Sequence, residues 1–190
     1  MALFNKNNAA QVQMSERQVL ENKYNSARSN LLLVVALTVI NIILLVTNSN
    51  RYFLFSAYIP FFITDLGMVL CGMYPEEAYA DMGTLDFLPK GVFVAMMCIA
   101  VIMVALYVLS WVFSKKKAGW LIFGMIFFVI DTLAMVALNG IVVESILDYV
   151  IHAWVVISLI GGVLANKKLK DLPEEPLPAF ENAVTTETVE

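Results

Sequence analysis

Residues 91–113 read GVFVAMMCIAVIMVALYVLSWVF, which is 23 consecutive residues without a charged side chain. A helix needs about 20 apolar residues to cross the hydrocarbon core of a bilayer, so this run predicts a membrane-spanning helix. Over all 190 residues, 60% are hydrophobic, only 15% are charged, and the mean hydropathy is +0.77. Soluble domains are roughly half apolar and a quarter charged. The composition therefore excludes a water-soluble globule and indicates a multi-pass membrane protein.

Four further apolar runs lie on either side of this one. Residues 31–47 carry no charged side chain, residues 52–74 and 120–138 carry one each, Asp65 and Asp131, and residues 141–165 carry Glu144, Asp148 and His152. Lipid offers no hydrogen-bond partners to the backbone, so each run should be helical. The predicted fold class is an all-α polytopic membrane helix bundle.

The run at residues 52–74 differs from the others. Pro60 near its middle would interrupt the hydrogen-bond ladder of a helix. Cytoplasmic loops are rich in Lys and Arg. If this run enters the membrane and returns, four spans remain and both termini are cytoplasmic, with ten Lys and Arg inside and only Arg51 and Lys90 outside. If it crosses, the better split is seven to five. We predict four spans plus one re-entrant or interfacial segment, with five spans as the alternative.

Both ends of the chain are polar. Residues 1–30 form a cytoplasmic N-terminal segment, in which Ser15 and Gln18 fit a capping box at the start of an amphipathic helix. That helix either lies on the membrane surface or is a solvated lead-in to the first span. Residues 31–166 form the transmembrane domain. Residues 167–190 form an acidic cytoplasmic tail; from residue 171 onward it has six acidic residues, three prolines and no base, a composition typical of disorder.

Two stretches carry a resemblance to known proteins. Residues 30–35, NLLLVV, and residues 52–57, YFLFSA, are similar to small multi-pass membrane proteins of Gram-positive bacteria. The resemblance covers about a quarter of the chain and implies no activity. It does imply a bacterial host, and with it a location in the bacterial plasma membrane.

The chain lacks the sequence signatures of common enzymes and of nucleic-acid binding. It has no metalloprotease H-E-x-x-H motif, no G-x-S-x-G motif and no Gly-rich phosphate loop. The two cysteines indicate neither a disulfide framework nor a zinc site, and the net charge of −4 argues against nucleic acid as a partner. We therefore expect no cofactor, and an enzyme is the least favoured class.

The remaining chemistry lies in polar residues within the apolar runs, where ionisable groups are costly and each suggests a function. Glu144, Asp148 and His152 are spaced by four residues, which puts them within an arc of about 80° on one helix face. Asp131 and Asp148 each lie about eight residues from the turn at residues 139–140, or about 12 Å below the helix ends. Asn41 lies at a similar depth in the first span.

Asn41, Asp131, Asp148 and His152, with Glu144 above them, could therefore converge from three helices. Two carboxylates at one depth would have to share a proton or a cation, and His152 could take part or ligate a metal; the sequence does not identify one. The alternatives are inter-helix hydrogen bonds of purely structural value and, less favoured, catalysis.

These observations predict an integral membrane protein that serves as a non-enzymatic accessory or scaffold subunit of a membrane complex. The alternative is a small transporter or channel component that uses the buried cluster for a proton or cation. The expected partners are the lipid bilayer and another membrane protein or a second copy of the chain.

Overall fold

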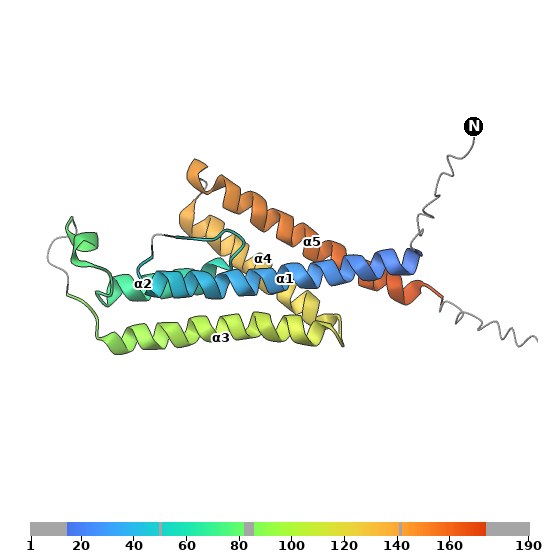
Figure 1. Cartoon of the computed structure of the whole chain (residues 1–190), viewed down its shortest axis with the longest axis horizontal. Helices are drawn as coiled ribbons and strands as arrows, with labels where there is room; N and C mark the ends of the chain where they lie inside the picture. The colour runs from blue at the N-terminus through green and yellow to red at the C-terminus, as the bar shows by residue number, and fades with distance from the viewer. Residues whose placement is uncertain (1–14, 50, 82–85, 141, 174–190) are drawn as a thin grey trace, which may run out of the picture.

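A computed structural model describes residues 15–49, 51–81, 86–140 and 142–173. Four of its helices are long and apolar enough to cross a membrane: α1 (Glu16–Val46), α3 (Lys90–Ser114), α4 (Gly119–Asn139) and α5 (Ile146–Asp171). The shorter apolar helix α2 (Tyr58–Leu70) and the 3-10 turns η1 (Glu76–Tyr79) and η2 (Val143–Ser145) complete the described chain, which contains no strand. The predicted all-α bundle with four long helices is confirmed (Figure 1).

The first long helix begins in the polar N-terminal segment and continues through the apolar run at residues 31–47 without a break. Ser15 caps α1, its side chain accepting from the Gln18 N–H while the Gln18 side chain accepts from the Ser15 N–H, so the capping box is confirmed. The separate membrane-lying helix is not found, because residues 16–29 are the first turns of α1. These turns are held by α5: a methyl group added at Gly162 would lie 2.3 Å from Cβ of Ala27.

The end of the bundle at which α1 begins and α5 ends is called the terminal end. There, basic and aromatic side chains of α1 form hydrogen bonds to the C-terminal ends of α3 and α5. Arg28 donates from Nε to Oγ of Ser114 at 2.8 Å, and Tyr24 donates to the Ser114 carbonyl at 2.6 Å, where α3 ends. Arg17 donates to the Pro173 carbonyl at 3.0 Å, just beyond α5. Cations are favourable at helix C-termini, where carbonyls lack partners. These residues therefore fix α3 and α5 against α1.

The segment between α1 and α3 enters the bundle and leaves it on the same side (Figure 1). The chain turns back after α1 and runs along it in the opposite sense, because Phe53 bonds to Asn41 and Ala57 bonds to the earlier residue Thr38. α2 then leads out again to the start of α3, where the Leu88 N–H donates to the Leu70 carbonyl. With 13 residues, about 20 Å, α2 is too short to cross. The structure thus has the re-entrant segment and not a fifth span.

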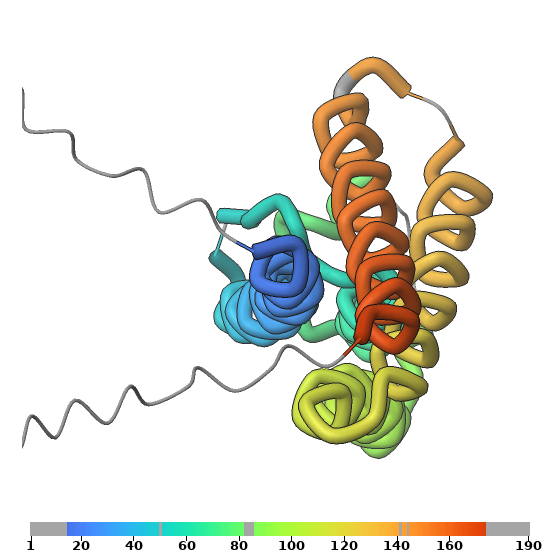
Figure 2. Tube along the Cα trace, turned by 90° about the vertical axis from the view of Figure 1, so that its right-hand side faces the viewer, coloured from blue at the N-terminus to red at the C-terminus, as the bar shows by residue number. Residues whose placement is uncertain are grey.

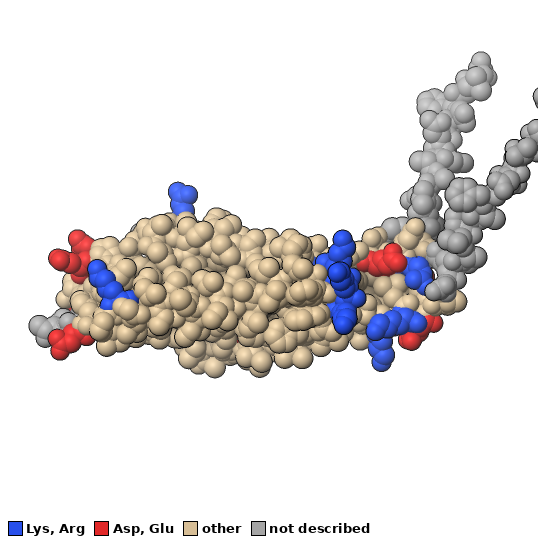
Figure 3. Space-filling model, turned by 90° about the horizontal axis from the view of Figure 1, so that it is seen from below, with Lys and Arg blue, Asp and Glu red and all other residues tan. Residues whose placement is uncertain are grey.

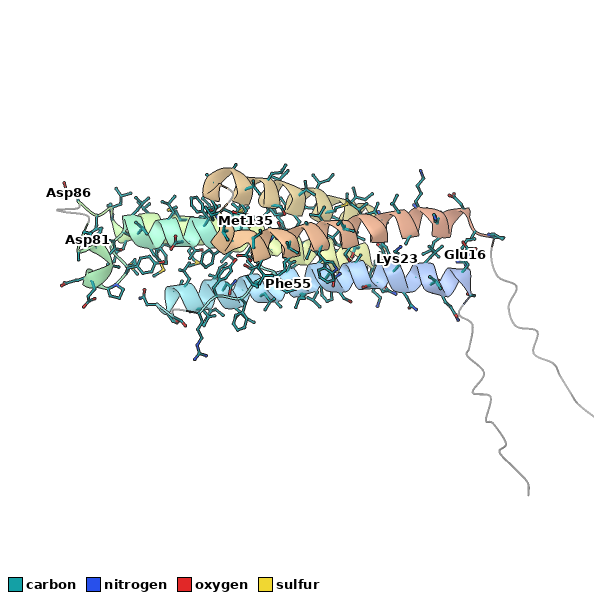
Figure 4. All side chains as sticks on the ribbon, turned by 90° about the horizontal axis from the view of Figure 1, so that it is seen from above. Glu16, Lys23, Phe55, Asp81, Asp86 and Met135 are labelled. Carbon is teal, nitrogen blue, oxygen red and sulfur yellow. The ribbon has the colours of Figure 1, made fainter. Side chains whose placement is uncertain are left out.

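The re-entrant helix is enclosed by the long helices. Figure 2 looks along the bundle, and α2 lies among α1, α3 and α4, all of which it contacts. Figure 4 places Phe55, in the returning chain, far from both Glu16 at one end and Asp81 and Asp86 at the other. The tip of the re-entrant segment therefore reaches deep into the bundle.

The charged residues gather at the two ends of the bundle. Figure 3 shows most of the visible Lys and Arg side chains near the end from which both terminal traces leave, a few toward the opposite end, acidic side chains at both ends, and a mostly uncharged stretch between them. α5 extends to Asp171, so the first five residues of the predicted tail, 167–171, are helical. Residues 1–14 and 174–190 lie outside the described chain.

Candidate functional site

The polar face of α1 meets the re-entrant segment. Asn41, 1% exposed, uses both ends of its amide: Nδ2 donates to the Phe53 carbonyl at 2.7 Å, and Oδ1 accepts from the Phe53 N–H at 2.8 Å. One turn away, the Thr38 hydroxyl accepts from the Ala57 N–H at 2.7 Å and donates to the Val34 carbonyl. Non-helical backbone is tolerated at membrane depth only where protein satisfies it. Thr38 and Asn41 provide that satisfaction.

Asp131 of α4 caps the re-entrant helix. Its carboxylate, 1% exposed, accepts from the Tyr58 N–H at 2.7 Å and from the Ile59 N–H at 2.8 Å. A helix begins with four N–H positions that lack a partner within the helix. At α2 these positions are Ala57, bonded to Thr38, then Tyr58 and Ile59, both bonded to Asp131, and finally Pro60, which has no N–H. Every one is accounted for, and a carboxylate is also favoured by the helix dipole at this end.

The backbone is strained between Phe53 and Ala57, the two residues of the returning chain that bond to α1. Phe55 has φ of 71°, a left-handed conformation that a bulky side chain rarely adopts. Its ring packs edge-on against Trp154 of α5, with centroids 5.9 Å apart. The strain is held in place because the flanking residues Phe53 and Ala57 are bonded to α1. Through this ring α5 also contributes to holding the segment.

His152 of α5 is fully buried, and only one of its two ring nitrogens has a hydrogen-bond partner in the described chain. Its Nδ1 lies 2.8 Å from the Asp148 carbonyl; because a carbonyl can only accept, Nδ1 carries the proton. Nε2 has no hydrogen-bond partner among the described residues. The imidazole stacks on the ring of Phe128 at an interplanar angle of 4°. With the proton on Nδ1, Nε2 presents an unpaired acceptor inside the bundle.

Asp148 lies nearer the end of its helix than the sequence indicates. α5 begins at Ile146, after η2, so Asp148 is in its first turn and not about eight residues into it. The residue is half-buried, and its Oδ1 is buried without a partner. Glu144 belongs to η2 and not to α5, so the expected helical stripe of three begins only at Asp148; the Glu144 side chain lies outside the described part.

The predicted cluster is brought together in part. His152 lies close enough to Asp131 and to Asp148 to interact electrostatically with both, and the Tyr52 hydroxyl interacts with the same two carboxylates. Asn41 of α1 and Asp131 of α4 both bond to the backbone of the re-entrant segment. A direct contact between Asp131 and Asp148, the centre of the shared-proton hypothesis, stays a prediction. In the described residues no group of three His, Cys, Asp or Glu side chains could hold a metal ion.

Sequence reasoning missed two members of this site. Thr38 stands three residues before Asn41, on the same face of an otherwise apolar run. This pair of polar residues could have been recognised from the sequence. Tyr107 of α3 is 1% exposed with an unpartnered hydroxyl; one tyrosine among 23 apolar residues gave no such signal. Asp65 lies within α2, and its carboxylate accepts from the Tyr74 hydroxyl.

No protein-family model, curated protein or solved structure matches this chain. The case for its function therefore comes from the geometry of the site and the surface of the bundle.

Proposed function

We propose that this protein is a non-enzymatic accessory or scaffold subunit of a membrane complex. One observation carries the proposal: Thr38, Asn41 and Asp131, three of the polar residues buried in the bundle, are hydrogen-bonded to backbone groups of the re-entrant segment. Side chains whose hydrogen-bonding groups are used within the protein hold its shape and are not free to bind a substrate. A rigid bundle with apolar outer faces suits a subunit that organises other membrane proteins.

We place the protein in a bacterial plasma membrane with both termini in the cytoplasm. Support comes from the ten Lys and Arg residues of the two terminal segments, 1–30 and 167–190, and the α3–α4 turn, against Arg51, after α1, and Lys90, the first residue of α3. An excess of this kind marks the cytoplasmic side. The bacterial host rests on the resemblance of residues 30–35 and 52–57 to proteins of Gram-positive bacteria.

The partner would be another membrane protein or a second copy of the chain, and photo-crosslinking in native membranes tests this. A photoreactive residue is placed at Ile102 of α3, Leu133 of α4 or Ile157 of α5, whose exposed fractions are 60%, 64% and 68%. Ala100, which is 0% exposed, is the matched inward-facing control on α3.

We expect at least one outward position to give a discrete protein adduct that the Ala100 probe does not give. If all three outward probes capture only lipid, the scaffold proposal is wrong.

A second candidate, a proton- or cation-conducting component, is favoured by two buried acceptors without a donor. These are Nε2 of His152 and Oδ1 of Asp148, and Asp131 lies within electrostatic range of His152. Nε2 therefore has a free lone pair that can receive a proton, and a carboxylate can pass a proton on. Histidine side chains are common proton shuttles in proteins.

Proteoliposomes with a trapped pH-sensitive dye separate the two candidates. A conducting protein should collapse an imposed pH gradient faster than empty liposomes, and His152→Gln should abolish the difference. Thr132→Val is the matched control, because the Thr132 hydroxyl bonds only to the Phe128 carbonyl of its own helix. Wild-type vesicles that leak no faster than empty ones would contradict the second candidate and leave the scaffold proposal standing.

A further inference from the structure

A groove runs between α1 and α5 near the terminal end of the bundle. It measures about 140 Å³ and is lined by Leu20 and Lys23 of α1 and by Gly161, Leu164, Ala165 and Lys168 of α5. Small residues form its floor: Ala165 is buried, and a Cβ added at Gly161 would lie 3.6 Å from Cε of Lys23. The stem of Lys23 therefore lies over Gly161 and forms part of the groove wall.

The two lysines at the groove are not neutralised by the protein. Neither Lys23 nor Lys168 forms a hydrogen bond or ion pair with another residue of the described chain. The acidic residues nearest to them along their helices, Glu21 and Asp171, are not among the residues that line the groove. Both lysines are exposed. Two ammonium groups left without counter-charge on one small groove favour an anion there.

The position of the groove identifies the anion. Lys168 follows the end of the apolar run of α5, and Leu164, one turn earlier, is 55% exposed on the outer face that lipid would cover. Figure 4 shows Lys23 toward the Glu16 end, and Figure 3 shows the band of basic side chains at that end. Headgroups and acyl chains of a phospholipid meet at this level, where lysines extend their charge to the interface while their stems stay in apolar surroundings.

We propose that the groove formed by Leu20, Lys23, Gly161, Leu164, Ala165 and Lys168 binds the headgroup of an anionic phospholipid. The phosphate lies between the two ammonium groups, and the first carbons of the acyl chains lie on the leucine side chains. The inference is independent of the proposed scaffold role, because it rests on a different surface of the bundle.

Native mass spectrometry of the full chain in detergent, titrated with phosphatidylglycerol, tests the proposal. We expect one phosphatidylglycerol to bind in preference to phosphatidylcholine. Each lysine near an anionic headgroup contributes a factor of about five in affinity, so the double variant Lys23→Gln/Lys168→Gln should bind roughly 25-fold more weakly. Gly161→Leu keeps both charges but fills the groove, and it should also lose the bound lipid.

The matched control is Lys115→Gln/Lys116→Gln, which removes the same charge from the turn after α3, at the same end of the bundle but outside the groove. It should change binding by less than about twofold, the scale of long-range surface charge. A control that weakens binding as much as the groove variants would show general surface attraction and overturn the proposal. So would equal binding of phosphatidylcholine, undiminished binding by Gly161→Leu, or displacement of the lipid by equimolar inorganic phosphate, which would indicate a free-anion site.

Discussion

Replacing Asp131 should weaken the fold in proportion to the number of α2 amides left without an acceptor. Asp131→Leu removes the partners of the Tyr58 and Ile59 N–H groups, which lie 2.7 and 2.8 Å from the carboxylate. A buried donor without a partner costs about 1–3 kcal/mol, so the loss of two should lower the free energy of unfolding by roughly 2–6 kcal/mol. The lost hydrogen bonds lie at the start of α2, so hydrogen exchange of the backbone amides should accelerate there first.

Asp131→Asn is expected to be intermediate. The amide keeps one acceptor oxygen, but its NH2 group faces the second backbone N–H, and two donors cannot bond to each other. The cost should be about 1–3 kcal/mol. The isosteric amide therefore does not preserve both bonds, because both oxygens of Asp131 accept from N–H groups. If Asp131 were instead a poorly compensated charge at a functional site, Asp131→Leu would stabilise the protein.

Reversible unfolding in mixed detergent–SDS micelles gives these free energies, and hydrogen exchange of residues 53–59 locates the loss. Thr132→Val is the control on the same helix, because its hydroxyl bonds to the Phe128 carbonyl of α4 itself at 2.8 Å. Stabilities of the Asn and Leu variants within about 0.5 kcal/mol of this control, the usual scatter of neutral substitutions, would refute the capping role of Asp131.

Three further predictions address packing, topology and pH. Gly162→Ala should destabilise the α1–α5 contact by about 1–3 kcal/mol in the same unfolding assay, since the added methyl would lie 2.3 Å from Cβ of Ala27, whereas Gly119→Ala meets nothing within 4 Å and should be tolerated. A cysteine at Glu77 should react with an impermeant maleimide added outside cells and one at Lys116 should not; labelling at Lys116 would overturn the orientation. Burial and the adjoining Asp65 carboxylate raise the pKa of Tyr74 above its ordinary 10.0; the unfolded chain then loses this proton first, so stability should fall as pH rises above about 10. Tyr74→Phe should flatten that dependence in denaturation midpoints, and an unchanged slope would exclude Tyr74 as its source.

The features read correctly from sequence are those determined by neighbouring residues. Uninterrupted apolar runs located the four long helices, and Ser15 with Gln18 located the first turn of α1. Pro60 and the distribution of Lys and Arg together indicated a segment that enters and returns. Pro60 sits in the first turn of α2, where its missing N–H costs nothing, so the helix starts just before the proline.

The features missed depend on contacts between distant residues. The partners of Asp131 are backbone groups 72 and 73 residues earlier in the chain, and no periodicity within α4 encodes them. The depth of Asp148 was misjudged because residues 142–145 form a separate turn before α5, and an apolar run does not show where a helix begins. Asn41 and Asp131 were identified as buried polar residues, but the hydrogen bonds that they form require the returning backbone.

The cap on α2 also constrains how the protein is made. The segment that Asp131 holds is synthesised well before Asp131 itself, so a nascent chain that has inserted only α1 and the following residues lacks the acceptor for two of its amides. Membrane insertion should therefore leave residues 51–59 at the aqueous interface until α4 has crossed, and only then can the segment enter. Assembly would pass through an early intermediate in which this segment is not yet bonded to Asp131, and the bundle would be completed in one late step, after α4 has inserted. Chains shortened before residue 131 would keep this segment open to proteases.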